Sequence, residues 1–524
     1  MKNRVWAYLA AGVLLGLLWF MINPRPVLDP AESSGSLEAG PETPPAATGN
    51  PVIRGENSPK TDKRSAGDAV DVSLETGSGK EIPGEKLVRF ASAEAYRKFL
   101  ALAPPAMVLG RIDALNSVRV KTGTWLADPL AQTGGSLSGN FYIRVPEVPL
   151  EVREKGDTLY RAVGKKALDL MGAEDVTENW GRGVKVALMD TPVEGMEKVE
   201  GETAGHGTAM RSLIQGQSGA ARGAAPGSEV VAFAVLNQEG KGSAFGLAEA
   251  IVKATDQGAR VINMSLGSEG DSPVVRDAVA YALGRNVVLV AAAGNEAVNR
   301  VSYPAAYEGV IAVASVDAGG NHLYFSNRGK AVDVAAPGFA VVAAWPGGKN
   351  VEVTGTSAST ALVSGAVAAL LSREPNLSAS QAAELVVKYA DATGLPGSAE
   401  EMGGGVVNLQ RVLNRNQRGV VDMAVGGVTL REEGSQGRIL VGIQNRGTET
   451  LNSPSLEISA GEERRKFYFG SLAPGGTAME SMSFDLARAR QEGGIGAGAA
   501  VSVRGDQQGS NDLWSGYFRI SKEK

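Results

Sequence analysis

The sequence predicts an α/β protein whose central sheet is parallel and carries helices on both faces. A small α+β module precedes this sheet and a β-sandwich follows it. Two observations lead to this prediction. Between residues 158 and 416, near-continuous apolar, β-branched runs alternate with stretches of helical periodicity, which is typical of parallel strands covered on both sides. On either side of that region the pattern changes, which indicates separate modules.

Composition sets limits on the possible functions. The chain has 524 residues, which suggests about three domains at roughly 150 residues each. Its net charge is −5 and it has no long basic block, which argues against nucleic acid as a partner. The absence of cysteine excludes disulfides, thiolate catalysis and cysteine metal sites, and leaves the compartment open. Since the only histidines are His206 and His322, any catalytic histidine is one of these two.

The first 22 residues predict a membrane anchor. Lys2 and Arg4 precede an uncharged run from Val5 to Ile22, whose length as a helix, about 27 Å, approaches that of a bilayer core. We expect an uncleaved signal anchor in residues 1–22, with the N-terminus in the cytoplasm and the catalytic region periplasmic or extracellular. The alternative is a cleaved signal peptide and a secreted protein, but no small-x-small cleavage site follows the run. Residues 23–85 are rich in Pro, Gly, Ser, Glu and Ala, so we expect a disordered linker there.

Residues 86–150 predict the small α+β module. Leu87–Phe90 has the pattern of a strand and Ser92–Ala103 that of an amphipathic helix. Residues 106–122 and Phe141–Val145 also have strand-like patterns, and the segment from Pro146 to Asp157 joins the module to the region that supplies the parallel sheet.

Residues 158–416 supply the strands of the parallel sheet. The strands are expected at Val184–Met189, Glu229–Val235, Val261–Ser265, Val287–Ala292 and Val310–Ser315. The clearest helices between them are expected at Ser243–Gln257 and Val274–Gly284. Sheets of this kind place functional residues at the carboxyl ends of their strands.

A further helix begins at the turn Gly355-Thr356-Ser357. Apolar residues recur behind it at helical spacing, which indicates that one face of the helix is buried; they are Leu362, Val363, Ala366, Val367, Leu370 and Leu371. Ser357 would then stand at the helix N-terminus, where free N–H groups and the helix dipole favour a developing negative charge. An ordinary N-cap serine is the alternative.

Residues 420–524 predict the β-sandwich. Turn residues separate strand-like runs, and we find no helical periodicity. The runs are Gly437–Gln444, Lys466–Phe469, Gly475–Asp485, Ala500–Val503 and Leu513–Ile520.

Four polar residues in this order suggest acyl-transfer chemistry: Asp190, His206, Asn295 and Ser357. Each alone fits a turn, a loop or a helix cap. Together they fit one mechanism, because a serine hydroxyl needs a base to take its proton and imidazole titrates near neutrality. A carboxylate would orient that imidazole, and the amide N–H of Asn295 could hold the oxyanion.

These blocks resemble the subtilisin-like serine proteases, or subtilases. The resemblance rests on Asp190-Thr191, His206-Gly207-Thr208, Ala292-Ala293-Gly294-Asn295 and Gly355-Thr356-Ser357. Three further blocks match: Asn263 to Gly267, Val332 to Gly338 and Gly403 to Asn408. The resemblance covers Thr158 to Asn416, about half the chain. It implies a serine endopeptidase with Asp190, His206 and Ser357 as the catalytic triad and Asn295 as the oxyanion donor.

The resemblance also implies substrate-binding residues. Two segments would flank an extended substrate and pair with its backbone: Gly240-Lys241-Gly242 and Ser265-Leu266-Gly267. The pocket for the residue before the cut would be lined by Ala292, Ala293, Gly294 and Ser302. Because Ser302 stands where many subtilases carry glycine, a shallower or more polar pocket is expected.

Partners and cofactors follow from the same resemblance. The module at 86–150 sits where subtilases carry a propeptide, which implies a folding aid and inhibitor removed by self-cleavage between about Val145 and Val184. No cofactor and no metal are expected; calcium is possible but unsupported, because Asp190 and His206 lie close in sequence. His322 matches no family block and is expected on the surface. Pro192, Ala358 and Ala361 replace residues usual in the family, so a catalytically silent, subtilase-like binding scaffold is the alternative function.

Overall fold

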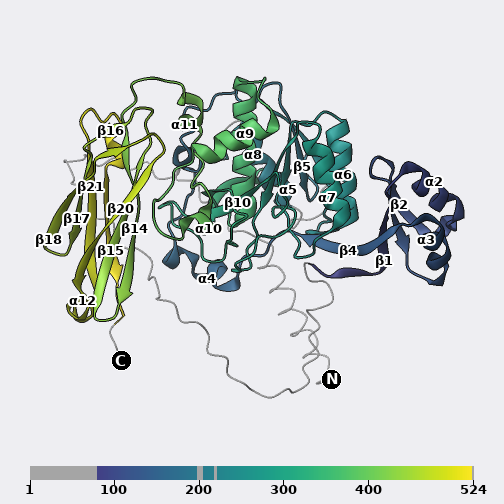
Figure 1. Cartoon of the computed structure of the whole chain (residues 1–524), viewed down its shortest axis with the longest axis horizontal. Coiled ribbons are helices and arrows are strands. Elements are labelled where there is room, and N and C mark those ends of the chain that lie inside the picture. Colours follow the sequence, from purple (N-terminus) through teal and green to yellow (C-terminus); the bar gives the residue numbers. More distant parts are fainter. Residues whose placement is uncertain (1–78, 197–204, 217–220, 522–524) are drawn as a thin grey trace, which may run out of the picture.

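The computed structural model describes residues 79–196, 205–216 and 221–521. They form an N-terminal module, a central α/β domain and a C-terminal sandwich, which lie in a row from right to left in Figure 1. The expected anchor and nearly all of the expected linker lie outside the described residues. Within the described part of the chain, every helix is too short or too polar to cross a membrane.

The N-terminal module is an antiparallel sheet with two helices packed on it. Its elements are β1 (Glu81–Arg89), α2 (Ala93–Leu102), β2 (Val108–Ile112), β3 (Ser117–Lys121), α3 (Ala127–Thr133) and β4 (Ser136–Arg144). Phe90, Tyr96 and Phe99 form the core beneath the helices, and Ser92 caps α2 by accepting from the Ala95 N–H. Strand β1 begins at Glu81, five residues before the predicted start of the module at residue 86. The single run at 106–122 is two strands, because a short turn ending at Asn116 divides it.

Strand β4 carries the module's sheet into the central domain. The strand order is β2-β3-β1-β4-β7, where β7 is Lys241–Ser243 of the central domain. The start of β4 pairs with β1, and its end pairs with β7 through Tyr142↔Ser243, Ile143↔Gly242 and Arg144↔Lys241. In Figure 1 this strand is the long arrow between the two parts.

The central domain contains the predicted parallel sheet, in the order β11-β10-β9-β8-β5-β6. Its strands are β5 (Lys185–Asp190), β6 (Glu229–Ala234), β8 (Val261–Met264), β9 (Val288–Ala292), β10 (Val310–Val316) and β11 (Val334–Pro337). Almost every residue of β5 and β8 to β11 is buried. That is the reason their sequences are continuously apolar instead of alternating.

Helices cover both faces of this sheet, as predicted. Alternate residues of β5 belong to different hydrophobic clusters: Val186 and Leu188 to one, Ala187 and Met189 to the other. The first cluster includes α5 (His206–Gln215), α8 (Thr356–Arg373) and α9 (Ala379–Lys388). The second includes α6 (Ala244–Asp256) and α7 (Pro273–Leu283).

Helix α8 is more deeply buried than its periodicity indicates. We expected one buried face, but every residue from Thr356 to Leu371 is buried. Small residues on the remaining faces permit this, and a Cβ on Gly365 would lie 2.9 Å from the Ala224 Cβ. The sequence did not predict β7, β11, α5 or α9. It also did not predict α4 (Leu150–Leu159), the hairpin β12 (Val341–Trp345) with β13 (Lys349–Val353), α10 (Ser398–Met402) and α11 (Leu409–Asn414).

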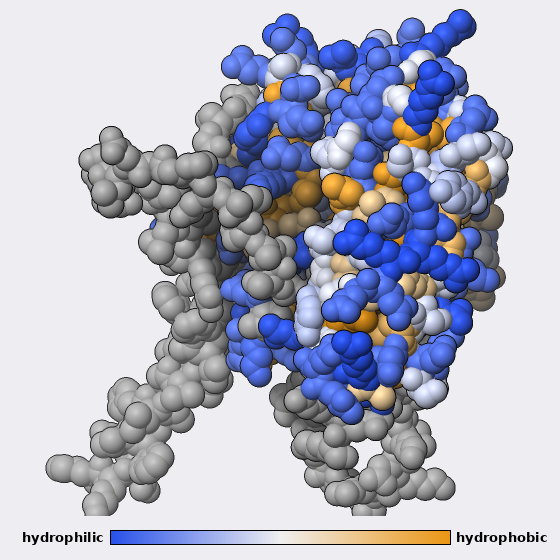
Figure 2. Space-filling view, turned by 90° about the vertical axis from the view of Figure 1, so that its left-hand side faces the viewer, coloured by the Kyte–Doolittle hydropathy of each residue, from blue (hydrophilic) through white to orange (hydrophobic). Residues whose placement is uncertain are grey.

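The C-terminal sandwich has two main antiparallel sheets around one core, and a two-stranded ribbon of β16 (Leu451–Asn452) and β19 (Ser471–Leu472). One sheet contains β14 (Met423–Glu433), β15 (Gln436–Asn445) and β20 (Thr477–Asp485); the other contains β18 (Glu463–Tyr468), β17 (Ser455–Ala460), β21 (Gly494–Ser502) and β22 (Leu513–Arg519). A short helix, α12 (Leu486–Glu492), is present where no helix was expected. Figure 2 views this end of the molecule, where hydrophilic residues cover most of the surface between small apolar groups.

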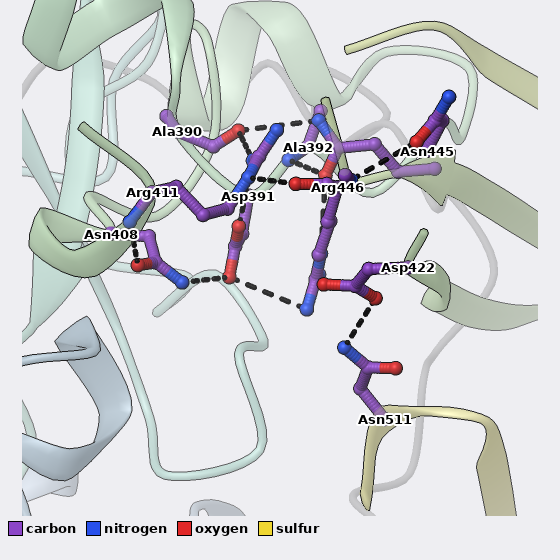
Figure 3. Close-up of polar contacts among 11 residues, drawn as sticks. Ala390, Asp391, Ala392, Asn408, Arg411, Asp422, Asn445, Arg446 and Asn511 are labelled. Atoms are coloured by element: carbon purple, nitrogen blue, oxygen red, sulfur yellow. Dashed lines mark hydrogen bonds and ion pairs between the residues drawn. The ribbon is translucent and has the colours of Figure 1, made fainter. Parts of the chain in front are cut away.

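Ion pairs join the sandwich to the central domain (Figure 3). Asp391, which follows α9, pairs with Arg411 at 2.8 Å and with Arg446 of the sandwich at 3.3 Å. Asn408 donates to Asp391 at 3.0 Å. A Cβ on Gly442 of β15 would lie 1.9 Å from the Thr393 carbonyl oxygen. The sheet β14-β15-β20 is therefore in direct contact with the segment after α9.

Candidate active site

Asp190 and His206 form a hydrogen-bonded pair at the carboxyl end of the sheet. Asp190 is the last residue of β5 and is fully buried. Its Oδ1 lies 2.6 Å from Nδ1 of His206, whose side chain is 20% exposed. His206 is the first residue of α5, not a loop residue. The Gly207 N–H donates to Thr191 Oγ1 at 2.9 Å, so the start of this helix is tied to the end of β5.

Ser357 is the second residue of α8 and is 5% exposed. Its hydroxyl donates to the Ser265 carbonyl oxygen at 3.2 Å, and the Ser265 hydroxyl donates to the Ser357 carbonyl oxygen at 3.0 Å. The nucleophile candidate is thus tied to the segment after β8. Transfer of its proton requires the hydroxyl to turn from Ser265 to the imidazole of His206.

A buried polar chain supports this arrangement from below. Asn263 Nδ2 donates to the Ser265 hydroxyl at 3.0 Å, and the Ser364 hydroxyl donates to Asn263 Oδ1 at 2.9 Å. All three side chains are fully buried. Two positions of α8, Ser357 and Ser364, are therefore connected to β8 and the residue that follows it.

Asn295 follows β9, and the fold determines how its amide points. Its Oδ1 accepts from the Thr356 N–H at 3.1 Å and from the Thr356 hydroxyl at 3.0 Å. Nδ2 is left to donate, and it donates to the Pro146 carbonyl oxygen at 2.9 Å. Gly355 has φ 133°, and a Cβ there would lie 2.8 Å from Nδ2. The helix start therefore needs glycine to leave room for the amide.

The expected substrate-binding segments lie on either side of the chain's own residues 142–146. Gly267 and Arg144 exchange two hydrogen bonds, N–H to O at 3.0 and 2.8 Å, and the Val145 N–H donates to the Gly240 carbonyl oxygen at 3.1 Å. Arg144 is also opposite Lys241 in β7. The two predicted edges therefore bind an extended segment by adding it as a strand. Leu266, between the paired residues, is fully buried.

The pocket residues predicted beside this segment are also brought together. Ala292 and Ala293 are fully buried, and the Ser302 N–H donates to the Ala293 carbonyl oxygen at 2.9 Å. Asn327 Nδ2 donates to that oxygen at 3.1 Å and to Glu296 at 2.6 Å. Gly294 has φ 108° and no room for a Cβ, which would lie 2.3 Å from Asn327 Nδ2.

Sequence reasoning missed Asn327, Glu296, Thr356 and Pro146 as parts of this site. The side chain of Ser302 joins the first two, because its hydroxyl lies within hydrogen-bond distance of both Asn327 and Glu296. Thr356 stood inside a recognised block but had no assigned role. Neither composition nor spacing distinguishes Pro146 or Asn327 from residues of ordinary turns.

His322 is only partly exposed, where we expected a surface residue. It stands between β10 and β11, and its Nε2 is buried without a hydrogen-bond partner among the described residues. Burial, with a smaller contribution from Arg328, lowers the pKa of His322 to about 4. Within the described residues, no group of three or more His, Asp or Glu side chains could hold a metal ion.

The central domain is similar to known proteins. The model of the Subtilase family matches residues 181–405. Subtilisin BL of Lederbergia lenta is 34% identical over 246 residues, which cover 44% of this chain and 90% of the subtilisin. Thermitase of Thermoactinomyces vulgaris is 35% identical over 234 residues, covering 41% of this chain and 83% of thermitase. A solved structure of the protease domain of PatA is 28% identical, covers 44% of this chain and 94% of that domain, and superposes with a TM-score of 0.41.

Proposed function

The chain belongs to the subtilase family of serine peptidases, and on that premise we propose that it is an endopeptidase acting through an acyl-enzyme on Ser357. One observation carries the proposal. Asn295 Nδ2 donates to a backbone carbonyl oxygen, that of Pro146, beside the N-terminus of the helix that bears Ser357. A peptide carbonyl held in this way is oriented for attack by a serine hydroxyl.

The proposed reaction uses the geometry of the described residues. The Ser357 hydroxyl oxygen attacks the carbonyl carbon, and His206 Nε2 takes the hydroxyl proton. Asp190, 2.6 Å from Nδ1, keeps the other ring nitrogen protonated and stabilises the imidazolium. Asn295 and the Ser357 backbone N–H hold the oxyanion. His206 then passes its proton to the leaving amine, and water hydrolyses the ester in the reverse sequence.

We propose proteins or peptides in extended conformation as substrates. The segments Gly240–Gly242 and Ser265–Gly267 offer main-chain groups on both sides of a bound strand, as their hydrogen bonds to Arg144 and Val145 illustrate. Main-chain pairing gives affinity for any extended chain, and the pockets for alternate side chains give selectivity.

The surrounding segments have roles that follow from this proposal. The N-terminal module acts as a propeptide, and residues 1–22 anchor the chain so that its catalytic domain lies outside the cytoplasm. The sandwich supports the catalytic domain, and binding of the substrate or of a surface is its alternative role. Fractionation of cells that express the Ser357→Ala chain tests the anchor: the full chain should stay with washed membranes, and deletion of residues 1–22 should release it. Release of both forms would argue for a secreted protein.

Fluorophosphonate labelling, read by intact mass, tests the activity. The purified full chain should gain one adduct, with or without trace trypsin to remove the module, and Ser357→Ala should gain none. Ser372→Ala, near the far end of the same helix, is the matched control and should label like wild type. An adduct on Ser357→Ala would contradict the assignment of Ser357 as the nucleophile. No adduct on wild type, even after trypsin, would favour the silent scaffold.

A further inference from the structure

The segment that ends β4 lies along the substrate-binding edges as a substrate would. Arg144 is paired with Gly267 on one side and with Lys241 on the other. The Ile143 side chain, 2% exposed, is packed in the hydrophobic cluster of α6 and α7. Pro146 is buried, and its carbonyl oxygen accepts from Asn295 at 2.9 Å. The bond between Pro146 and Glu147 is therefore the one presented to Ser357.

Pro146 breaks the pairing at the residue that carries this bond. Arg144 and Gly267 form an antiparallel pair that exchanges both N–H···O bonds. Pro146, two residues after Arg144, stands opposite Ser265, two residues before Gly267. The next pair of N–H···O hydrogen bonds between the two strands would form there. Proline has no N–H to donate. The Ser265 carbonyl oxygen accepts the hydroxyl of Ser357 instead, at 3.2 Å.

The Ser265 carbonyl oxygen thus accepts a hydroxyl in place of a backbone N–H, and this has two effects on cleavage of the bond between Pro146 and Glu147. The residue before the bond loses one main-chain anchor, so its carbonyl is held less firmly against Asn295. The Ser357 hydroxyl also gains the Ser265 carbonyl oxygen as an acceptor that competes with His206. The hydrogen bond between Ser357 and Ser265 must break before the proton passes to His206. With an ordinary residue at this position, the backbone N–H would occupy the Ser265 oxygen and leave the Ser357 hydroxyl for the base.

The chain beyond the bond is held as well. The Val148 side chain lies beside Gly355, 3.4 Å from where a Cβ would stand. Val152 of α4 is 3% exposed and packs in a cluster with Leu323, Phe325 and Phe339. After acylation the new amine of Glu147 therefore stays close to the ester, and its high effective concentration favours re-formation of the peptide bond.

We propose that residues 143–146 are a slow substrate of their own active site, cut at Pro146–Glu147, and that the missing N–H of Pro146 delays the cut. The inference rests on the proposed function and adds the bond and its regulation. In the step, the Ser357 oxygen bonds to the Pro146 carbonyl carbon, the bond to the Glu147 nitrogen breaks, and the hydroxyl proton passes through His206 to that nitrogen. Water then hydrolyses the ester.

A time course of intact mass on the full chain tests this proposal. Pro146→Ala restores the N–H and should be cut about tenfold faster than wild type, the effect of one hydrogen bond of ordinary strength, with Glu147 as the new N-terminal residue. Pro149→Ala removes a proline beyond the bond, outside the ladder, and should keep the wild-type rate. The double variant Pro146→Ala/Ser357→Ala should stay intact. Its melting temperature should equal that of Ser357→Ala, which checks that the alanine at 146 leaves the fold unchanged.

Each other result has a definite meaning. Cleavage of Pro146→Ala at the wild-type rate would contradict the claim that Pro146 slows the reaction. A new N-terminal residue other than Glu147 would contradict the claim that the bond between Pro146 and Glu147 is cut. Fluorophosphonate labelling of Ser357 without any cut at residue 146 in Pro146→Ala would overturn this proposal alone. Neither label nor cut in any variant, even after trace trypsin, would overturn the proposed function and this inference with it.

Discussion

Asn295 uses the two ends of its amide for different purposes. Its oxygen accepts two hydrogen bonds from Thr356, and its nitrogen donates to the carbonyl that the site holds. In the flipped orientation the amide nitrogen would face the Thr356 N–H and the amide oxygen would face the Pro146 carbonyl oxygen, so the network determines the orientation. Because the side chain is 2% exposed, water competes little for its N–H.

We therefore expect Asn295→Leu to lower kcat while the chain stays folded. The expected loss is about 10²- to 10³-fold, which is the known effect of removing this donor in subtilisin and is adopted from that enzyme. Turnover of a peptide substrate by the mature enzyme measures it. Asn299→Leu, an exposed asparagine close by, is the control and should keep wild-type kcat. Equal kcat for the two variants would contradict the assignment of Asn295.

His322 makes stability depend on acid. Its pKa is lowered to about 4 in the folded state, chiefly by burial, against about 6.5 in the unfolded chain. Between these values the unfolded chain binds a proton that the folded protein does not. Stability is thus fully present above pH 6.5, falls as the pH drops toward 4, and should have lost about 2 kcal/mol by pH 5.

Urea unfolding of Ser357→Ala protein at pH 7.5 and pH 5 measures this loss, since the serine variant cannot digest itself. Adding His322→Leu removes the titrating group and should reduce the difference between the two pH values by about 2 kcal/mol. The same pH dependence with and without His322 would show that other groups are responsible.

Among the elements, α8 and β8 act as one unit. Ser357 and Ser364 stand two turns apart on α8, and the chain Ser364–Asn263–Ser265–Ser357 connects both to the strand. Since these groups are fully buried or nearly so, each needs its partner, and the loss of one leaves another without a hydrogen bond. The network thereby sets the position of the nucleophile as well as the packing of the helix.

Ser364→Ala should destabilise the protein by about 1–3 kcal/mol, because Asn263 Oδ1 loses its donor inside the core. It should also lower kcat more than it raises KM, since the shift reaches Ser357 through Ser265. Unfolding in the Ser357→Ala background and turnover in the active chain measure the two effects. Ser380→Ala, exposed on α9, should change neither. An unchanged stability of Ser364→Ala would show that the network contributes little.

For the whole molecule, the modules on either side of the central domain are attached by different means. The N-terminal module shares a sheet with it through β4 and β7 and adds the Arg89–Asp277 ion pair at 2.9 Å. The sandwich depends on the cluster around Asp391 (Figure 3). The side chains of Arg411, Asp391 and Arg446 are only 9%, 15% and 15% exposed, so these charges have little water to replace a lost partner.

Asp391→Ala should therefore cost about 3–5 kcal/mol, since it leaves two poorly hydrated guanidinium groups without their carboxylate. Glu433→Ala removes one partner of the exposed Arg438 pair on the sandwich and should cost no more than about 1 kcal/mol. Urea unfolding of both in the Ser357→Ala background compares them, and proteolysis should release the sandwich first in Asp391→Ala. Equal costs for the two would mean that the cluster is not a structural attachment.

The fold class followed from the sequence, with identifiable omissions. Five of the six strands of the parallel sheet match their predicted ranges to within two residues, because continuous β-branched runs are buried on both faces; β11 was not predicted as a strand. Strand β14 was missed since Gly426 and Gly427 interrupt its pattern. Helix α4 was missed because its sequence is largely charged, and its burial comes from Val152 packed against Phe339 and its neighbours.

By itself the sequence determined the parallel sheet and the order of Asp190, His206, Asn295 and Ser357, because strand periodicity and catalytic side chains both leave local patterns. Only the tertiary structure decided which segment lies across Ser357 and which carbonyl Asn295 holds. Those contacts are main-chain hydrogen bonds between segments far apart in the chain, and a backbone N–H is the same in nearly every residue. Proline at 146 is the exception that the sequence contains, but its meaning depends on the strand opposite.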